Sequence, residues 1–376
     1  VGKIKEEDVM ELEDLSCPSF GSCSFLGTAN TMACVAESLG MSLLGSALIP
    51  AVYSERRRIA FDSGFAVCNL VKNNISARNV ITEEAVRNSI TTVMTICGST
   101  NAVMHISAIA HEADLNIDIM QEFKWLYFQI PQIAKVNPAA KWDMEDFYKA
   151  GGIPRVLKNM GEAINTEVMT CSGKSLGENL KEYRFRYPEN CEIIRHMDHP
   201  FHDKGGIAIL QGNLAPDTAV TKPGAFDVSL HRFIGKARVY DGEEMANEAI
   251  LREDIRDGDV IVIRYEGPKG GPGKFLYGMG KATSTAVITD GRFSGTNNGC
   301  FVGHISPEAA DGGPIAIVED GDEILIDVHS GLLELHVSEE IIAERYKNWE
   351  KPQKTIEHGY LKLYCFLRFF PIFISL

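Results

Sequence analysis

The sequence predicts a protein of mixed helices and strands that is built in two parts. Its 376 residues suffice for two domains of about 100–200 residues each. Apolar residues with helical spacing dominate residues 27–161, whereas from about residue 190 short runs rich in Ile and Val alternate with turns. We expect the boundary between the two parts near residues 171–187.

The first part carries the apolar periodicity of helices. Met32, Val35 and Leu39 lie at positions i, i+3 and i+7, and Gly40 follows as a stop signal. A further short helix is expected after the glycine and proline residues of 151–154. Helices are therefore expected at 28–39, 55–72, 83–96, 101–112 and 144–149.

The second part has the pattern of short strands separated by tight turns. Asp257-Gly258 and Asp320-Gly321 are typical turn pairs between apolar runs. Strands are expected at 206–210, 237–240, 260–265, 285–289, 315–318 and 324–328, with one helix at 243–251.

Composition and charge exclude some classes of partner. Hydrophobic residues make up 45% and charged residues 23%, as in an ordinary protein with a full core. The net charge of −14 argues against binding to nucleic acid or to an anionic membrane, because both need basic patches. A small acidic substrate remains compatible with it, since a local site can be positive on an acidic protein.

The cysteines and the N-terminal residues indicate the cellular compartment in which the protein is expected. Nine cysteines are scattered over the chain, and residues 1–14 lack the apolar stretch of a secretory signal, so we expect a reducing, cytoplasmic compartment.

The chain opens with Val1 and closes on the very apolar run 364–376. That run is shorter than the roughly 20 residues that cross a bilayer. A docked tail, an altered reading frame and an artefact all stay open for it.

The first candidate for chemistry is a pair of cysteines ahead of a predicted helix. Cys17 and Cys23 flank a Ser/Gly loop, and Gly27-Thr28 follows at the helix start. The positive end of a helix dipole favours a thiolate at Cys23, and the thiolate is the form that binds metal. Two cysteines do not make a cluster site, since iron–sulfur centres usually take four ligands. Buried or incidental thiols therefore remain the alternative.

Two further motifs follow predicted strands. Residues 267–273 (GPKGGPG) form a loop whose backbone can approach a ligand closely, or a tight surface turn. Ser294 lies between glycines in 289–296 (TDGRFSGT), where its hydroxyl can be exposed at a strand end or bonded within a turn. The pattern is not that of a hydrolase nucleophile, and no histidine lies nearby in sequence to act as its base.

The histidines favour no metal site from their spacing. His196, His199 and His202 would alternate between faces of an extended segment, which predicts scattered and partly exposed side chains. His111-Glu112 does not continue into the zinc-protease pattern H-E-x-x-H.

Taken together, the motifs resemble those of the dihydroxy-acid and 6-phosphogluconate or aldonate dehydratases. The resemblance extends from about Cys17 to Tyr364, and the DGRFSG wording is closer to the dihydroxy-acid branch. The stretches that carry it are CPSFGSCSFLGTANTM (17–32), GGIAILQGNLAPDTAVTK (205–222), VIRYEGPKGGPG (262–273) and TDGRFSGTNNGCFVGHISPEAADGGPIAIVEDGD (289–322).

The resemblance implies a fold and an assembly. It implies an α/β N-terminal domain, incomplete here, over residues 1–185, a β-barrel-like C-terminal domain over 186–363, and an atypical tail at 364–376. It further implies a homo-oligomer, a homodimer in the simplest form, that acts on a small hydroxy acid in branched-chain amino-acid biosynthesis.

The resemblance also implies a hydro-lyase mechanism. In this family an iron of a 2Fe–2S or 4Fe–4S cluster acts as Lewis acid on the departing 3-hydroxyl, and Mg²⁺ binds the carboxylate end. A serine alkoxide takes the proton from C2, and the enol product tautomerises to a 2-keto acid. By motif, Cys23 corresponds to one cluster ligand and Ser294 to the base. A serine can act so only where nearby positive charge lowers its pKa greatly.

The sequence departs from the family pattern at two places. Only sixteen residues precede Cys17, so the family's longer N-terminal region with further cluster cysteines and a C-D-K run has no counterpart. The family continues GGPG with M-P-E-M, whose Glu binds metal, but Gly273 is followed directly by Lys274, and nearby Glu266 does not match that position. We therefore expect impaired activity from the chain alone. An aldonate dehydratase, a non-catalytic truncated relative and a subunit completed by another chain are the alternatives.

Overall fold

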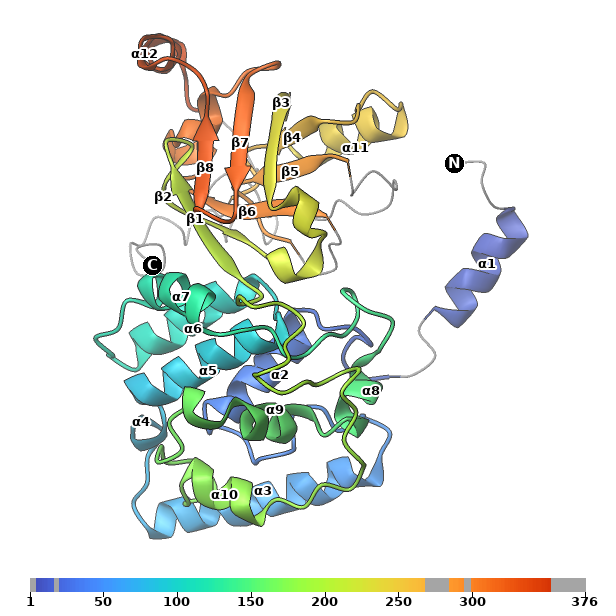
Figure 1. The fold of residues 1–376 in the computed structure, drawn as a ribbon, viewed down its shortest axis with the longest axis vertical. Coiled ribbons are helices and arrows are strands. Elements are labelled where there is room, and N and C mark those ends of the chain that lie inside the picture. The colour runs from blue at the N-terminus through green and yellow to red at the C-terminus, as the bar shows by residue number, and fades with distance from the viewer. Residues whose placement is uncertain (1–4, 17–19, 268–283, 294–298, 353–376) are drawn as a thin grey trace, which may run out of the picture.

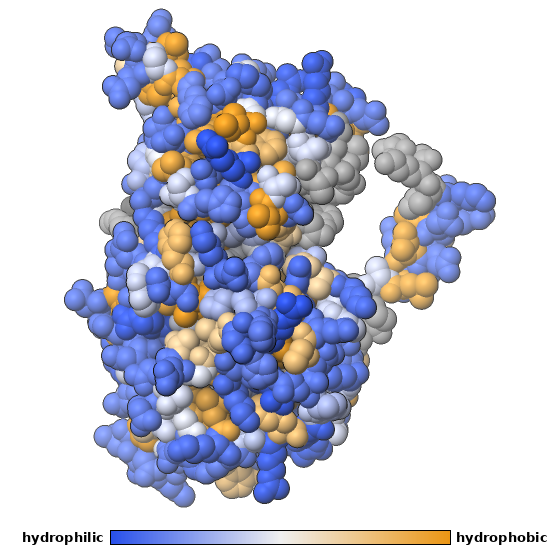
Figure 2. Space-filling model, viewed as in Figure 1, coloured by the Kyte–Doolittle hydropathy of each residue, from blue (hydrophilic) through white to orange (hydrophobic). Residues whose placement is uncertain are grey.

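The computed structural model of the chain describes residues 5–16, 20–267, 284–293 and 299–352. Figure 1 shows a helical region that contains the first half of the chain, with a β-barrel stacked on it. Helix α1 (Glu6–Leu15) lies apart from both, and none of its residues is buried. Its side chains include the exposed Val9, Met10, Leu12 and Leu15, and Figure 2 shows apolar groups along it.

The helical region is organised around α5 (Glu83–Ile96). This helix packs against α2 (Thr28–Ser38), α6 (Asn101–Glu112), α7 (Ile119–Gln129) and α9 (Gly152–Met160). Thr82 caps its N-terminus by accepting a hydrogen bond from the Ala85 N–H. The remaining helices are α3 (Ser54–Lys72), α4 (Ala77–Val80), α8 (Met144–Lys149) and α10 (Leu176–Glu182).

The second region is a closed barrel with the strand order β1-β2-β6-β5-β4-β3-β7-β8. The strands are β1 (Ala208–Gly212), β2 (Ala215–Thr221), β3 (Arg232–Tyr240), β4 (Asp259–Ile263), β5 (Ala286–Thr289), β6 (Cys300–Ser306), β7 (Glu323–Asp327) and β8 (Leu332–Leu335). Helix α11 (Glu243–Leu251) packs against β3 and β4, and α12 (Glu339–Asn348) follows the last strand.

The parallel part of the barrel decides where two of the motifs lie. Strands β3, β4, β5 and β6 pair in parallel, with Ile263 of β4 opposite Thr289 of β5. Because parallel strands end at the same edge, the loops that follow β4 and β5 leave the barrel side by side. The glycine-rich motif and the DGRFSG motif therefore begin at one edge of the barrel.

Most predicted elements are confirmed. Helices α5, α6, α8 and α11 have the predicted bounds, α2 and α3 differ from them by one residue, and the expected helix after 151–154 is α9. Five expected strands correspond to β1, β3, β4, β5 and β7. The strand expected at 315–318 is wrong, because Pro314–Ile317 forms a 3-10 helix. Proline at its first position fixes φ and favours a helical start, and the apolar run reflects burial of Ile315 and Ile317.

The expected domain classes are confirmed in part. The C-terminal barrel is present, and the whole is a mixture of helices and strands. In the described residues of the first domain, 5–16 and 20–185, the structure has helices and isolated bridges such as Met169–Ser175, so the α/β class expected for that domain is not seen there. Packing of helix on helix buries their apolar faces without a sheet. The boundaries 1–185 and 186–363 and the incompleteness of the first domain stay predictions.

Among the described residues, no helix is both long enough and apolar enough to span a membrane.

Candidate functional site

The loop that carries Cys23 is fixed by the first turn of α2. Asn30 donates hydrogen bonds from Nδ2 to the carbonyls of Cys23 (2.6 Å) and Phe25 (2.8 Å). Its Oδ1 accepts one from Ser22 Oγ at 2.7 Å. Cys23 itself is exposed. One buried amide thus sets the path of the Ser/Gly loop and presents the thiol of Cys23 to solvent ahead of the helix.

A second amide joins this helix to the barrel. Asn101, at the start of α6, donates from Nδ2 to Thr28 Oγ1 (2.9 Å) and to the carbonyl of Phe293 (2.8 Å). Thr28 is the first residue of α2, and Ser99 Oγ lies 3.0 Å from its hydroxyl. The helix that holds the cysteine loop and the loop that follows β5 therefore meet at Asn101.

This junction bears directly on Ser294. The serine lies outside the described residues, but Phe293 is its neighbour in the chain. The structure thus brings the start of the DGRFSG loop to the N-terminal end of α2, where the Cys23 loop enters. Cys17 and residues 268–273 of the glycine-rich motif lie outside the described ranges as well.

Asp290 fixes the loops of the barrel on the same side. Its carboxylate accepts backbone hydrogen bonds from Tyr265 (3.1 Å), Glu266 (3.0 Å) and Ala309 (2.9 Å). Burial raises the pKa of Asp290, while these three N–H donors act in the opposite direction. One side chain therefore ties together the loop after β4, the loop after β5 and the turn after β6.

A half-buried histidine, His304, is bonded to the start of the DGRFSG loop. The His304 N–H donates to the carbonyl of Gly291 at 2.9 Å, and its backbone has a φ of 55°. Burial, with Arg292 and His105 nearby, lowers the pKa of His304 to about 3, so its imidazole is neutral at physiological pH. Its Nε2 has no hydrogen-bond partner within the described part of the chain. Gly303 is needed here because a Cβ would lie 2.9 Å from the Phe293 ring.

Sequence reasoning did not single out Asn101, Asp290 or His304. Asn101 follows Gly98-Ser99-Thr100 at a helix start, and Asp290 and His304 lie inside quoted motifs. Their roles depend on contacts between residues that are distant in sequence, such as Asn101 and Phe293. The signal in the sequence that could have indicated Asn101 is the polar cluster Ser99-Thr100-Asn101 at the start of a predicted helix.

The described residues do not fit an iron–sulfur cluster at Cys23. A cluster usually takes about four protein ligands, whereas among the described side chains Cys23 belongs to no group of three potential ligands whose donor atoms lie within 4.8 Å of one another. Glu266 is already engaged, because its Oε1 accepts the Glu243 N–H at 3.0 Å. Among the described residues, the exposed thiol of Cys23 therefore has no two further ligands within this distance.

The three spaced histidines do not gather at one point. His196 and His199 are exposed, and His196 Nε2 lies 3.0 Å from Glu189 Oε1. His202 is partly buried, which lowers its pKa, and pairs with Gln132 through the backbone. The prediction that they are scattered is confirmed, although His196 has a cysteine and a glutamate as neighbours.

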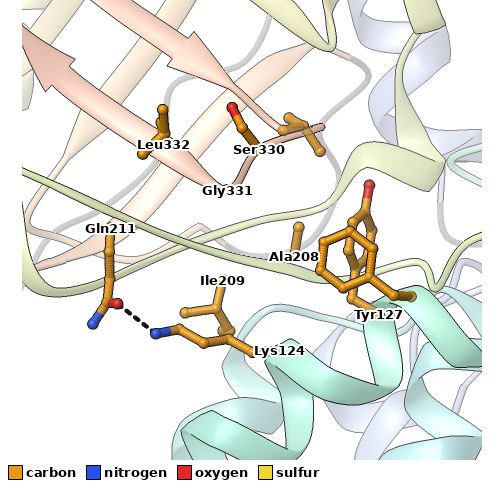
Figure 3. A pocket seen from close by; sticks show the side chains of 10 residues that line it. Lys124, Tyr127, Ala208, Ile209, Gln211, Ser330, Gly331 and Leu332 are labelled. Atoms are coloured by element: carbon orange, nitrogen blue, oxygen red, sulfur yellow. Dashed lines mark hydrogen bonds between the residues drawn. The ribbon is translucent and has the colours of Figure 1, made fainter.

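A cavity of about 280 Å³ lies between α7 and the strands β1 and β8 (Figure 3). Lys124, Tyr127, Ile209, Gln211, Ser330 and Leu332 are among the residues that line it, and Lys124 Nζ donates to Gln211 Oε1. None of its lining residues belongs to the Cys23 or DGRFSG motifs. This cavity is therefore distinct from the junction around Asn101.

Comparisons with known proteins place the chain in a family. The models "Dihydroxy-acid/6-phosphogluconate dehydratase N-terminal" and "C-terminal" match residues 1–179 and 192–367. The proteins named dihydroxy-acid dehydratase from Thermodesulfovibrio yellowstonii and Caldanaerobacter subterraneus are 48% and 45% identical over 97% and 96% of this chain. The matches cover 67% and 66% of those proteins, so the chain spans about two thirds of their length.

A dihydroxy-acid dehydratase from the archaeon Methanosarcina barkeri is 43% identical over 96% of the chain and 67% of its own length. The resemblance drawn from the cysteine, glycine-rich and serine motifs is thereby confirmed. The chain belongs to the dihydroxy-acid/6-phosphogluconate dehydratase family of hydro-lyases.

Proposed function

We propose that the chain is the greater part of a dihydroxy-acid dehydratase, which removes water from a 2,3-dihydroxy acid to give a 2-keto acid. The observation that carries this proposal is the contact of Asn101 with both Thr28 and Phe293. It supports a shared site for the cysteine and serine motifs. The relatives' names favour the dihydroxy-acid reaction over that of a 6-phosphogluconate or aldonate dehydratase.

Ser294 is the proposed base. Loss of the C2 proton to the serine and of the C3 hydroxyl as hydroxide gives an enol, and hydroxide with that proton makes up the departing water. The enol then tautomerises to the 2-keto acid. The nearby His304 is neutral and supplies no cation, whereas Arg292 within this loop carries a positive charge. A serine needs more positive charge than this to ionise near neutral pH.

Cys23 is the proposed ligand of an iron–sulfur cluster, which would supply Lewis-acid chemistry when bound. Because the described donors do not fit the cluster by themselves, we derive no step through it. We expect the chain alone to have little or no dehydratase activity. A non-catalytic relative, or a subunit completed by a second chain, is the alternative. A homo-oligomer in the cytoplasm, Mg²⁺ use and a place in branched-chain amino-acid biosynthesis complete the proposal.

The test compares the chain with a chimera. The chimera adds the portions of the Thermodesulfovibrio yellowstonii protein that this chain does not cover. Both are reconstituted anaerobically with iron and sulfide, and 2-keto acid release is measured from 2,3-dihydroxyisovalerate and from gluconate. We expect turnover of the first substrate by the chimera alone, and its loss in the Ser294→Ala chimera.

Three results would overturn parts of this proposal. Turnover by the unmodified chain would refute its impairment, and preference of the chimera for gluconate would favour an aldonate dehydratase. A folded chimera that binds iron and turns over neither substrate would favour the non-catalytic alternative.

A further inference from the structure

We propose that Glu189, Cys191 and His196 form a binding site for a zinc-type divalent transition metal. A carboxylate oxygen, Sγ and an imidazole nitrogen of these residues all lie within 4.8 Å of one another. His196 Nε2 lies 3.0 Å from Glu189 Oε1. The three residues belong to the segment between α10 and β1, outside the four stretches that carry the family resemblance. The inference does not depend on the proposed dehydratase activity.

The donor set selects the kind of metal. Zinc binds a thiolate at about 2.3 Å and an imidazole or carboxylate at about 2.0–2.2 Å, so donors of a tetrahedral site lie roughly 3.3–3.8 Å apart. The donor atoms lie within 4.8 Å of one another, so metal binding requires exposed side chains to move closer together. Thiolate and imidazole disfavour Mg²⁺ and Ca²⁺, which prefer oxygen ligands. Three protein donors leave a fourth position for water.

The backbone between Cys191 and His196 is held by hydrogen bonds. The N–H groups of Ile193 and Ile194 donate to the Asn190 carbonyl at 3.1 and 3.0 Å, and both side chains are buried. The Arg195 N–H donates to the Ile133 carbonyl at 2.8 Å, and the Arg195 carbonyl accepts from Asn159 Nδ2 at 3.0 Å. The turn is therefore held against the helical region between Cys191 and His196.

The exposure of the donors suits a metal that is taken up from solution. Glu189, Cys191 and His196 are all exposed, so a hydrated ion can reach them and the fourth position stays open to water. An exposed ion pair between His196 and Glu189 contributes little by itself. A metal bound to the folded turn, and not to the unfolded chain, would raise the midpoint of thermal unfolding.

The test uses Co²⁺ as a spectroscopic substitute for zinc, with the reduced full chain under anaerobic conditions. We expect one Co²⁺ per chain with thiolate-to-cobalt charge-transfer absorption, which equimolar Zn²⁺ abolishes. Cys191→Ser should remove the absorption, and His196→Ala should weaken binding at least tenfold. Circular dichroism shows whether each variant is folded.

Two matched variants separate this site from other exposed groups. Cys68→Ser removes an exposed thiol on α3, and His199→Ala removes an exposed imidazole three residues from His196, so both should bind like the unmodified chain. Cys23→Ser should also leave the absorption unchanged. The proposal fails if the absorption is absent, if it persists in Cys191→Ser, or if it is lost in Cys23→Ser.

Discussion

The helical region and the barrel each contain a buried carboxylate that holds a loop, but the two carboxylates act over different lengths of chain. Glu37 of α2 accepts the N–H groups of Gly45 (2.6 Å) and Ala47 (2.8 Å), which close the loop after its own helix. Asp290 accepts three N–H groups from two other loops of the barrel. Burial raises the pKa of both, in Glu37 to about 7.

The difference shows how each region maintains its shape. Glu37 binds backbone groups no more than ten residues away in the chain. Because its pKa is raised to about 7, its carboxyl group changes from protonated to ionised near neutral pH. Asp290 connects residues up to 25 positions away, and its loops carry the glycine-rich and serine motifs. Loss of Asp290 should therefore disturb the candidate site, whereas loss of Glu37 should change mainly the pH dependence of stability.

The largest effect is expected for Asp290→Ala. This substitution leaves three backbone N–H donors without their acceptor, at about 1 kcal/mol or more each, so the free energy of unfolding should fall by about 3–5 kcal/mol. Asp290→Asn keeps one acceptor oxygen and should cost less. Urea unfolding followed by circular dichroism measures both.

Asp320→Ala is the matched control for this substitution. Asp320 is an exposed carboxylate of the barrel that accepts one N–H, from Val239, at 2.7 Å. Its removal should cost about 1 kcal/mol or less. Equal losses for Asp290→Ala and Asp320→Ala would show that the barrel loops do not depend on the buried carboxylate.

The second prediction concerns the pH dependence that Glu37 produces. Its folded-state pKa of about 7 lies above the ordinary value of 4.5, so between these values the folded chain keeps a proton that the unfolded chain has lost. Stability should therefore fall as pH rises from 4.5 to 7, by about 3 kcal/mol in total. Cys34, Cys171 and Tyr183 face Glu37, and their raised pKa values keep them neutral in this window.

Glu37→Gln isolates this contribution, because glutamine does not titrate and retains a carbonyl acceptor. Urea unfolding at pH 5, 6 and 7 should show a flatter profile for Glu37→Gln than for the unmodified chain. Glu178→Gln is the control, since the pKa of Glu178 is lowered by its bonds to Ser175 and its contribution has the opposite sign. Parallel profiles for Glu37→Gln and the unmodified chain would contradict the prediction.

The helices and strands that the sequence predicted best are those with a regular pattern of apolar residues. Helices α5, α6 and α11 carry regular apolar spacing, and β4 is a run of Ile and Val buried on both faces. Strand β2 was missed, because Pro216 and Asp217 interrupt its pattern on an exposed stretch. Helix α7 was missed as well, and its apolar pattern includes the exposed Trp125 and Phe128.

The candidate site was predictable as motifs but not as geometry. The residue types and order around Cys23 and Ser294 indicated the family, which the comparisons confirm. The contact between α6 and the loop after β5 spans 192 residues, and no local pattern encodes it. The roles of Cys23 as ligand and Ser294 as base stay predictions.

The smallest expected effect tests this contact between the two regions. Asn101→Ala removes three neutral hydrogen bonds, to Thr28, Ser99 and Phe293, so the free energy of unfolding should fall by about 1–2 kcal/mol. The more specific readout is local, because the loop loses its attachment to α6 and trypsin should cleave after Arg292 several times faster under native conditions. Asn159→Ala removes one side-chain hydrogen bond inside the helical region, from Nδ2 to the Arg195 carbonyl. It should lower the free energy of unfolding by a similar amount without changing cleavage after Arg292. If both variants expose Arg292 equally, the contact is not what holds the serine loop, and the common site of the two motifs loses its main support.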